Sequence, residues 1–122
     1  MELNNNNLKE LIEVHCSKKG YTEYDYEEFI TYTFLIHNKS DNGIRAIKGE
    51  VVFNNIFDEK IQSMSFVYDQ PIKAGGKVTW NATTEYNPYR SEDRALRDKD
   101  LKDIKLIWNP EKVILQNGST LG

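Results

Sequence analysis

Apolar and polar residues alternate through most of this chain, and turn residues interrupt the alternation about every ten residues. The clearest segment covers residues 29–38, where aromatic and aliphatic side chains occupy one parity and threonines the other. A period of two is typical of a strand with one buried face. The pattern therefore predicts a sheet protein rather than a helical one.

Further strands are expected at residues 11–17, 44–53, 61–68, 78–83, 104–108 and 113–115. The apolar parity changes near Gly49, which predicts a β-bulge there. Asn109-Pro110 is expected to form a turn between the last two strands. Residues 91–103 are mostly charged and favour one or two helical turns that cross between sheets. These elements predict an all-β antiparallel sandwich of about seven or eight strands with one short helical crossover.

The alternation also predicts which aromatic side chains form the core. We expect the inward positions to be largely buried, and they are Tyr32, Phe34, Phe53, Trp80 and Trp108. Large aromatic side chains on facing strands usually fill the space between the two sheets.

The length of 122 residues fits one domain. Residues 1–10, MELNNNNLKE, are polar and are expected to be a flexible N-terminal segment, which leaves residues 11–118 as the sandwich domain. The formal net charge is −3, with basic and acidic residues intermixed. Because no basic stripe is present, the composition argues against nucleic acid as a partner.

No cofactor, metal site or enzymatic activity is expected. Cys16 is the only cysteine, so no internal disulfide can form. Its neighbour His15 points to the opposite face of a strand, which disfavours a shared metal ion or a Cys-His nucleophile. No apolar run approaches the roughly 20 residues needed to span a bilayer, so direct membrane insertion is not expected either.

The segment GYTEYDYEE, residues 20–28, has no clear period and is interpreted as a loop. Tyrosines among carboxylates are a common composition of protein interfaces, while the alternative is that they only cover the edge of the core. The charged crossover could contribute to the same surface. The candidate binding residues are Tyr21, Glu23, Tyr24, Asp25, Tyr26, Glu27, Arg90 and Arg94.

Four stretches in succession carry a resemblance to a known group of domains: HNKSD, IRAIKGEVVFNNIFDEKI, PIKAGGKVTW and LIWNPEKVILQNG. Together they resemble the immunoglobulin-like domain of bacterial cell-surface lipoproteins, related to FxLYD domains. The resemblance covers roughly residues 11–118. It implies an immunoglobulin-like fold and a binding or structural module without a reaction.

Two functions remain open at this stage. The first is a non-catalytic protein-binding or structural module of a bacterial surface protein. The second is a small intracellular inhibitor or mimic, of a kind that a phage could encode, that acts through the acidic tyrosine-rich segment. The chain would lie at the cell surface if it was trimmed from an exported precursor, and in the cytoplasm if Met1 is native. The identity of the protein partner and the oligomeric state stay open.

Overall fold

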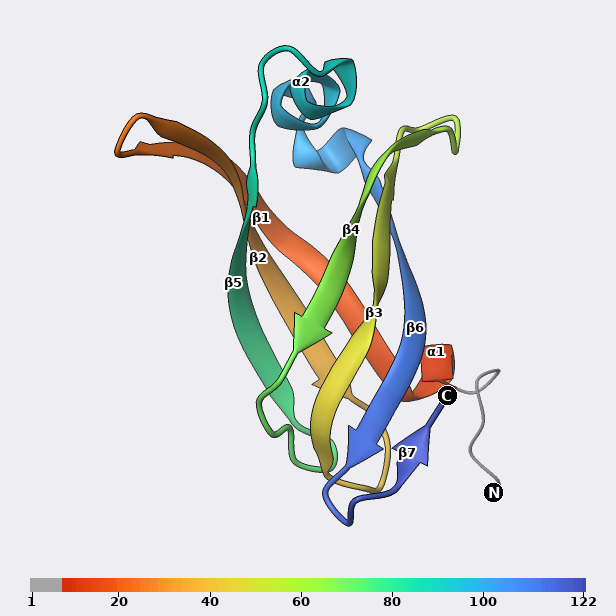
Figure 1. Cartoon of the computed structure of the whole chain (residues 1–122). Coiled ribbons are helices and arrows are strands. Elements are labelled where there is room, and N and C mark those ends of the chain that lie inside the picture. The colour runs from red at the N-terminus through yellow and green to blue at the C-terminus, as the bar shows by residue number, and fades with distance from the viewer. Residues whose placement is uncertain (1–7) are drawn as a thin grey trace.

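A computed structural model describes residues 8–122 and arranges seven strands in two antiparallel sheets (Figure 1). One sheet has the order β1-β2-β5, and the other has the order β4-β3-β6-β7. The predicted antiparallel sandwich is thus confirmed, with seven strands. Their bounds are β1 Ile12–Tyr24, β2 Glu27–Asn38, β3 Ile44–Asn54, β4 Lys60–Tyr68, β5 Lys77–Glu85, β6 Lys105–Leu115 and β7 Thr120–Leu121.

Alternate residues of the strands fill the space between the sheets, as the sequence predicted. Tyr32 stacks on Phe34 within β2 and on Phe53 of the opposite sheet, with both pairs of ring centroids 5.6 Å apart. These three side chains and Trp108 are buried. Trp80 is only half-buried, because β5 lies at the edge of its sheet. The prediction that Trp80 is largely buried was therefore too strong.

The β-bulge expected at Gly49 of β3 is at Arg45 instead, because Ile44 pairs with Leu115 and Ala46 with the adjacent Ile114. A second register shift lies between Lys48 and Gly49, but there the extra residue is Glu111 of β6, since Lys48 pairs with Lys112 and Gly49 with Pro110. The prediction of a turn at Asn109-Pro110 is wrong, because β6 continues through these two residues as one strand. β7 pairs only with Val113 and Ile114, so the edge of β6 opposite β3 is unpaired at Pro110, and proline is tolerated in strands with such an edge.

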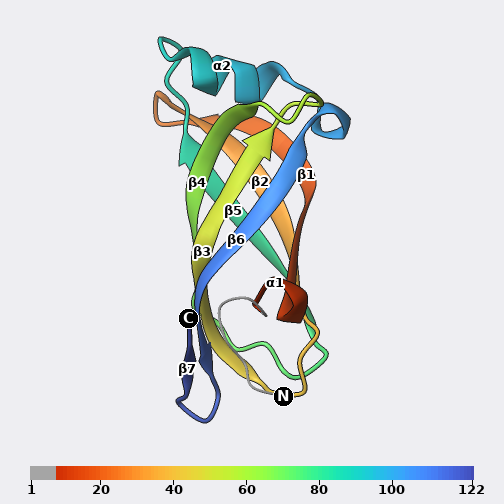
Figure 2. The same ribbon diagram turned by 90° about the vertical axis from the view of Figure 1, so that its right-hand side faces the viewer.

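The charged segment forms the predicted helical crossover between the sheets. It consists of α2, Ser91–Asp98, and a short 3-10 helix, Leu101–Asp103. Leu96 of α2 is buried. Asp93 fastens the helix, because its carboxylate accepts hydrogen bonds from the Gln62 side chain of β4 and from the Asn87 backbone N–H. α2 consequently covers one end of the sandwich (Figures 1 and 2).

Regular secondary structure is present before residue 11, where the domain was predicted to begin. The first seven residues of the expected flexible segment lie outside the described part of the chain. From Leu8 the chain forms a helical turn, α1 Leu8–Leu11, and the Leu8 side chain is fully buried. α1 lies beside the start of β1 and next to β6 (Figure 2). The structured domain therefore includes residues 8–10.

Two predicted segments at the start of the chain also need correction. The expected short outer strand is a long one, because β1 runs on to Tyr24 and pairs with β2 along its whole length. The expected loop at residues 20–28 is thus the distal part of a β-hairpin. Its polar outer residues hid the alternation, because this part of the hairpin extends beyond the core and neither face is deeply buried.

Candidate binding surface

The β1–β2 hairpin ends in a two-residue turn of unusual composition. Asp25 and Tyr26 both have positive φ angles, 50° and 66°. Two such residues in a hairpin turn are typical of type I′, which normally favours Asn-Gly or Asp-Gly. A tyrosine stands here in place of that glycine. The turn leaves Tyr24 76% exposed and Tyr26 96% exposed.

Tyr21 has a different position at the base of this extension. It is half-buried and meets Tyr86 edge to face, with ring centroids 5.7 Å apart, while the Arg97 guanidinium lies 3.9 Å above its ring. Its hydroxyl donates a hydrogen bond to the Glu28 carboxylate, and this bond raises the pKa of Tyr21 to about 12. Tyr21 thus anchors the hairpin to the helical crossover and does not form part of the free tip.

Two further turns expose aromatic side chains at the same end of the molecule. In the β3–β4 turn, the Asn55 side-chain oxygen accepts the backbone N–H of Phe57, whose side chain is 76% exposed. Before α2, the Asn87 side-chain oxygen accepts the N–H of Tyr89, which is 91% exposed. Both are Asx-turns, in which an asparagine side chain fixes the backbone two residues later.

The hairpin tip, the β3–β4 turn and the segment leading into α2 all lie at the end of the sandwich that α2 covers (Figure 1). We call this the aromatic end and define it by Tyr24, Tyr26, Phe57 and Tyr89. Three segments distant in sequence contribute to it. Each of these segments is a hydrogen-bonded turn or a paired hairpin rather than an irregular loop.

The charged candidates lie at this end but act largely within their own segments. Arg90 forms an ion pair with Glu92 at 3.2 Å, and the Arg94 guanidinium donates to the Pro88 carbonyl at 2.6 Å. The hairpin carboxylates are exposed and carry negative charge beside the tip. The exposed members of the predicted set are Glu23, Tyr24, Asp25, Tyr26, Glu27, Arg90 and Arg94, whereas Tyr21 is half-buried.

Phe57 and Tyr89 were not among the residues predicted from the sequence. Both follow an asparagine by two positions, in Asn55-Ile56-Phe57 and Asn87-Pro88-Tyr89. An Asn-x-aromatic segment between strands is therefore a signal that could have identified them. That signal rests on the Asx-turn, in which the asparagine side chain holds the backbone of the residue two positions later.

The His15–Cys16 pair shows no arrangement suited to metal binding or nucleophilic catalysis. His15 lies on the outer face and forms a 3.7 Å pair with Glu13, while the Cys16 thiol donates to the Lys18 carbonyl on the inner side. Burial raises the pKa of Cys16, which disfavours the reactive thiolate. Within residues 8–122, no three histidine, cysteine or acidic side chains gather as metal ligands would. The helices of this part of the chain are also too short and polar to cross a bilayer.

Comparison with known proteins adds information on the fold alone. No protein-family model matches the chain, and no curated protein matches it by sequence. The X-ray structure of Northeast Structural Genomics Consortium target SoR45 is similar, with a TM-score of 0.51 and 12% sequence identity. The similarity covers 93% of this chain and 81% of that one. At this identity it supports the β-sandwich architecture and carries no statement about function.

Proposed function

We propose that this protein is a non-catalytic protein-binding module that recognises its partner through the aromatic end. The observation that carries the proposal is the exposure of Tyr24, Tyr26, Phe57 and Tyr89 on ordered turns at one end of the sandwich. Tyrosine and other aromatic residues contribute large contact areas and dominate the energy of many interfaces. Hydrogen bonds that hold the backbone of these turns before binding lower the entropy lost when a complex forms.

The conformation of Tyr26 supports the same function. A bulky residue with φ near +66° is strained, and glycine is favoured at this position of the turn. Strained residues often mark functional sites, where the side chain is retained despite its conformational energy. Binding by the Tyr26 side chain provides a reason for a tyrosine at this position.

The charge of the hairpin indicates the chemistry of the partner. Glu23, Asp25 and Glu27 are exposed around the tip, and no ion pair involves any of them within residues 8–122. Such rim charges steer association toward a surface of opposite sign. We therefore propose a protein partner with a basic patch next to an apolar one.

The proposal includes an immunoglobulin-like module of a bacterial surface protein, as the sequence resemblance implies. The strand order is compatible with this, because β1-β2-β5 faces a sheet formed around β3 and β6. In constant-type immunoglobulin domains the fourth strand joins the first sheet, whereas β4 here pairs with β3. The fourth strand thus belongs to the other sheet, as an additional edge beside β3.

The test is site-specific photocrosslinking followed by affinity measurement. A photoreactive phenylalanine at Tyr26 is expected to crosslink the partner, and the same group at Leu35, exposed on the outer face of a sheet, serves as the control. With the identified partner, Tyr24→Ala combined with Tyr26→Ala should weaken binding by about 2 kcal/mol or more. Leu35→Ala should leave the affinity unchanged.

Equal crosslinking from positions 26 and 35, or equal affinity of the double variant and the wild type, would place the interface elsewhere. Thermal melts of each variant show whether the fold persists. We expect it to persist, because both tyrosines lie outside the core.

The second candidate, an inhibitor that inserts an acidic hairpin into a basic site, is favoured by one observation. Glu27, Glu28 and Glu85 line a groove of about 300 Å³ beside Tyr26. Charge reversal at Glu23, Asp25 and Glu27 separates the two functions. An inhibitor of a basic site should lose most of its affinity, whereas a module bound by its aromatic side chains should mainly associate more slowly.

A further inference from the structure

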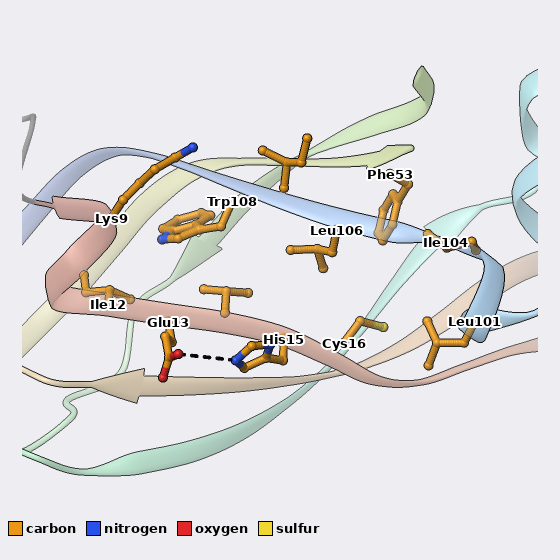
Figure 3. A pocket seen from close by; sticks show the side chains of 12 residues that line it. Lys9, Ile12, Glu13, His15, Cys16, Phe53, Leu101, Ile104, Leu106 and Trp108 are labelled. Atoms are coloured by element: carbon orange, nitrogen blue, oxygen red, sulfur yellow. Dashed lines mark ion pairs between the residues drawn. The ribbon is translucent and has the colours of Figure 1, made fainter. Parts of the chain in front are cut away.

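A groove separates the edges of the two sheets on the side where β1 faces β6 (Figure 3). Its volume is about 520 Å³, within the range of small-molecule sites. α1 bounds one end, and the 3-10 helix bounds the other. Apolar side chains form most of its wall, among them Ile12, Val14, Phe53, Leu101, Leu106 and Trp108.

Both strands that flank this groove are poorly suited to pairing with an added peptide strand. β6 carries Pro110, which has no N–H, and its register against β3 shifts at that position. β1 has an irregularity between Cys16 and Lys18. Prolines and bulges are common devices that prevent edge strands from pairing with another chain. The groove therefore favours an apolar small molecule over an extended peptide.

Two hydrogen-bond donors lie at the α1 end of the groove. Trp108 is 7% exposed, and its indole nitrogen is buried without a hydrogen-bond partner in the described part of the chain. Figure 3 shows this nitrogen turned toward Ile12 and the Lys9 side chain extending from α1 beside the indole. Within residues 8–122, Lys9 forms no ion pair. An unsatisfied buried donor is unfavourable, and an acceptor on a ligand would satisfy it.

We propose that this groove binds an amphiphilic carboxylate, with the acyl chain along β1 and β6 and the carboxylate at Lys9 and Trp108. The two ends of the groove differ in chemistry, and this difference is the reason for proposing an amphiphilic ligand. The donors Lys9 and Trp108 lie at the α1 end, and the wall toward the 3-10 helix is apolar. Because the indole nitrogen is buried, contact between it and the carboxylate requires a shift of α1.

Glu13 also lines the groove, but its carboxylate faces away from the site proposed for the ligand carboxylate. Glu13 belongs to the outer parity of β1, and its carboxylate contacts His37 at 3.4 Å and His15 at 3.7 Å. Figure 3 shows the Glu13 side chain directed away from the indole. Cys16 lines the groove and is the only cysteine, so it provides a chemical reporter of occupancy.

The test uses decanoate, below its micelle-forming concentration, on the full chain. Trp80→Phe leaves Trp108 as the only tryptophan, so its fluorescence reports on the groove. We expect saturable binding of decanoate, weaker binding of decanol, and no binding of decyltrimethylammonium. From octanoate to decanoate the affinity should rise about four-fold per methylene, as expected for burial of the chain. Decanoate should also slow the alkylation of Cys16 by iodoacetamide.

Variants then test the headgroup site. Lys9→Gln should weaken decanoate binding about two- to five-fold, the range of a partly exposed ion pair, and should leave decanol unaffected. Lys112→Gln, at an exposed lysine outside the groove, is the matched control and should change neither. Trp108→Phe should reduce the preference for decanoate over decanol, measured by protection of Cys16.

Several results would overturn the proposal. They are equal binding of decanol and decanoate, binding of the ammonium amphiphile, an affinity independent of chain length, or no protection of Cys16 at millimolar decanoate. Protection of Cys16 by an extended peptide but not by decanoate would assign the groove to strand pairing instead. None of these readouts depends on the aromatic end, so the two proposals succeed or fail separately.

Discussion

Gly49 and Trp108 are matched in shape across the pairing of β3 with β6. A Cβ atom at Gly49 would lie 2.5 Å from the Cη2 atom of Trp108 and 2.5 Å from the Asn109 carbonyl oxygen. The indole thus packs directly against the β3 backbone, at the bulge where the register shifts. Glycine at this position permits the close approach.

Gly49→Ala is expected to destabilise the protein by about 1 to 3 kcal/mol, because the added methyl group overpacks the core. Urea unfolding measures the change in the free energy of unfolding. In a protein that already carries Trp108→Leu, Gly49→Ala should destabilise by less. The contact of the added methyl group with the indole ring is then absent, while its contact with the Asn109 carbonyl oxygen remains. Full additivity of the two changes would show that ring and glycine do not interact.

Tyr26→Gly is expected to raise the free energy of unfolding by about 0.5 to 1 kcal/mol, although it removes a large side chain. Glycine relieves the left-handed strain, and its greater freedom in the unfolded chain offsets part of the gain. Asp25→Gly is the matched control and should gain less, because aspartate tolerates positive φ better. A loss of stability in Tyr26→Gly would mean that the side chain packs against the fold.

Asn38→Ala is expected to destabilise the protein by more than about 2 kcal/mol. The fully buried Asn38 side chain donates to the carbonyls of Asn42, Ile72 and Lys73 and accepts the Ser40 backbone N–H, and its removal breaks all of these hydrogen bonds. Asn81→Ala is the control: the exposed Asn81 accepts one bond from Thr33, so its loss should change stability by about 0.5 kcal/mol or less. Chemical denaturation measures the free energy of unfolding of both variants. Similar losses in Asn38→Ala and Asn81→Ala would contradict the stabilising role of Asn38.

Stability is expected to fall at high pH, because burial raises the pKa of Tyr32 from 10.0 to about 12. The folded state favours the protonated phenol, so its contribution is complete below pH 10 and is lost as the pH rises toward 12. Thermal melts at several pH values should show a shallower alkaline decline for Tyr32→Phe. The difference in ultraviolet absorbance between the two proteins should place the ionisation of Tyr32 above pH 10 while the chain remains folded.

The sequence predicted those elements whose side chains alternate over a buried face. β2 and β3 were recognised almost to the residue, and the change of apolar parity along β3 indicated a bulge, which lies at Arg45 rather than at Gly49. The distal half of β1 was missed, because it extends past the core and follows no single apolar face. β6 was predicted as two strands separated at Pro110, because proline usually ends a strand. Only the pairing pattern reveals that this part of its edge is free.

The residues of the candidate site likewise fall into some that the sequence predicted and others that it did not. Tyr24 and Tyr26 were found because they cluster in sequence, and the structure places both at an exposed tip. Phe57 and Tyr89 were missed because they join this surface only through the folding of distant segments. The groove between β1 and β6 was likewise hidden, since it depends on which strands lie at the sheet edges.

The separation of the three aromatic turns along the chain affects how this surface can change. Each turn is closed by hydrogen bonds within its own segment or hairpin, with Asn55 and Asn87 closing two of them. The tip residues can therefore be exchanged one segment at a time, with little effect on the sheets or on the other two turns. A library that varies positions 24, 26, 57 and 89 while retaining both asparagines would turn this domain into a scaffold for selecting new binders.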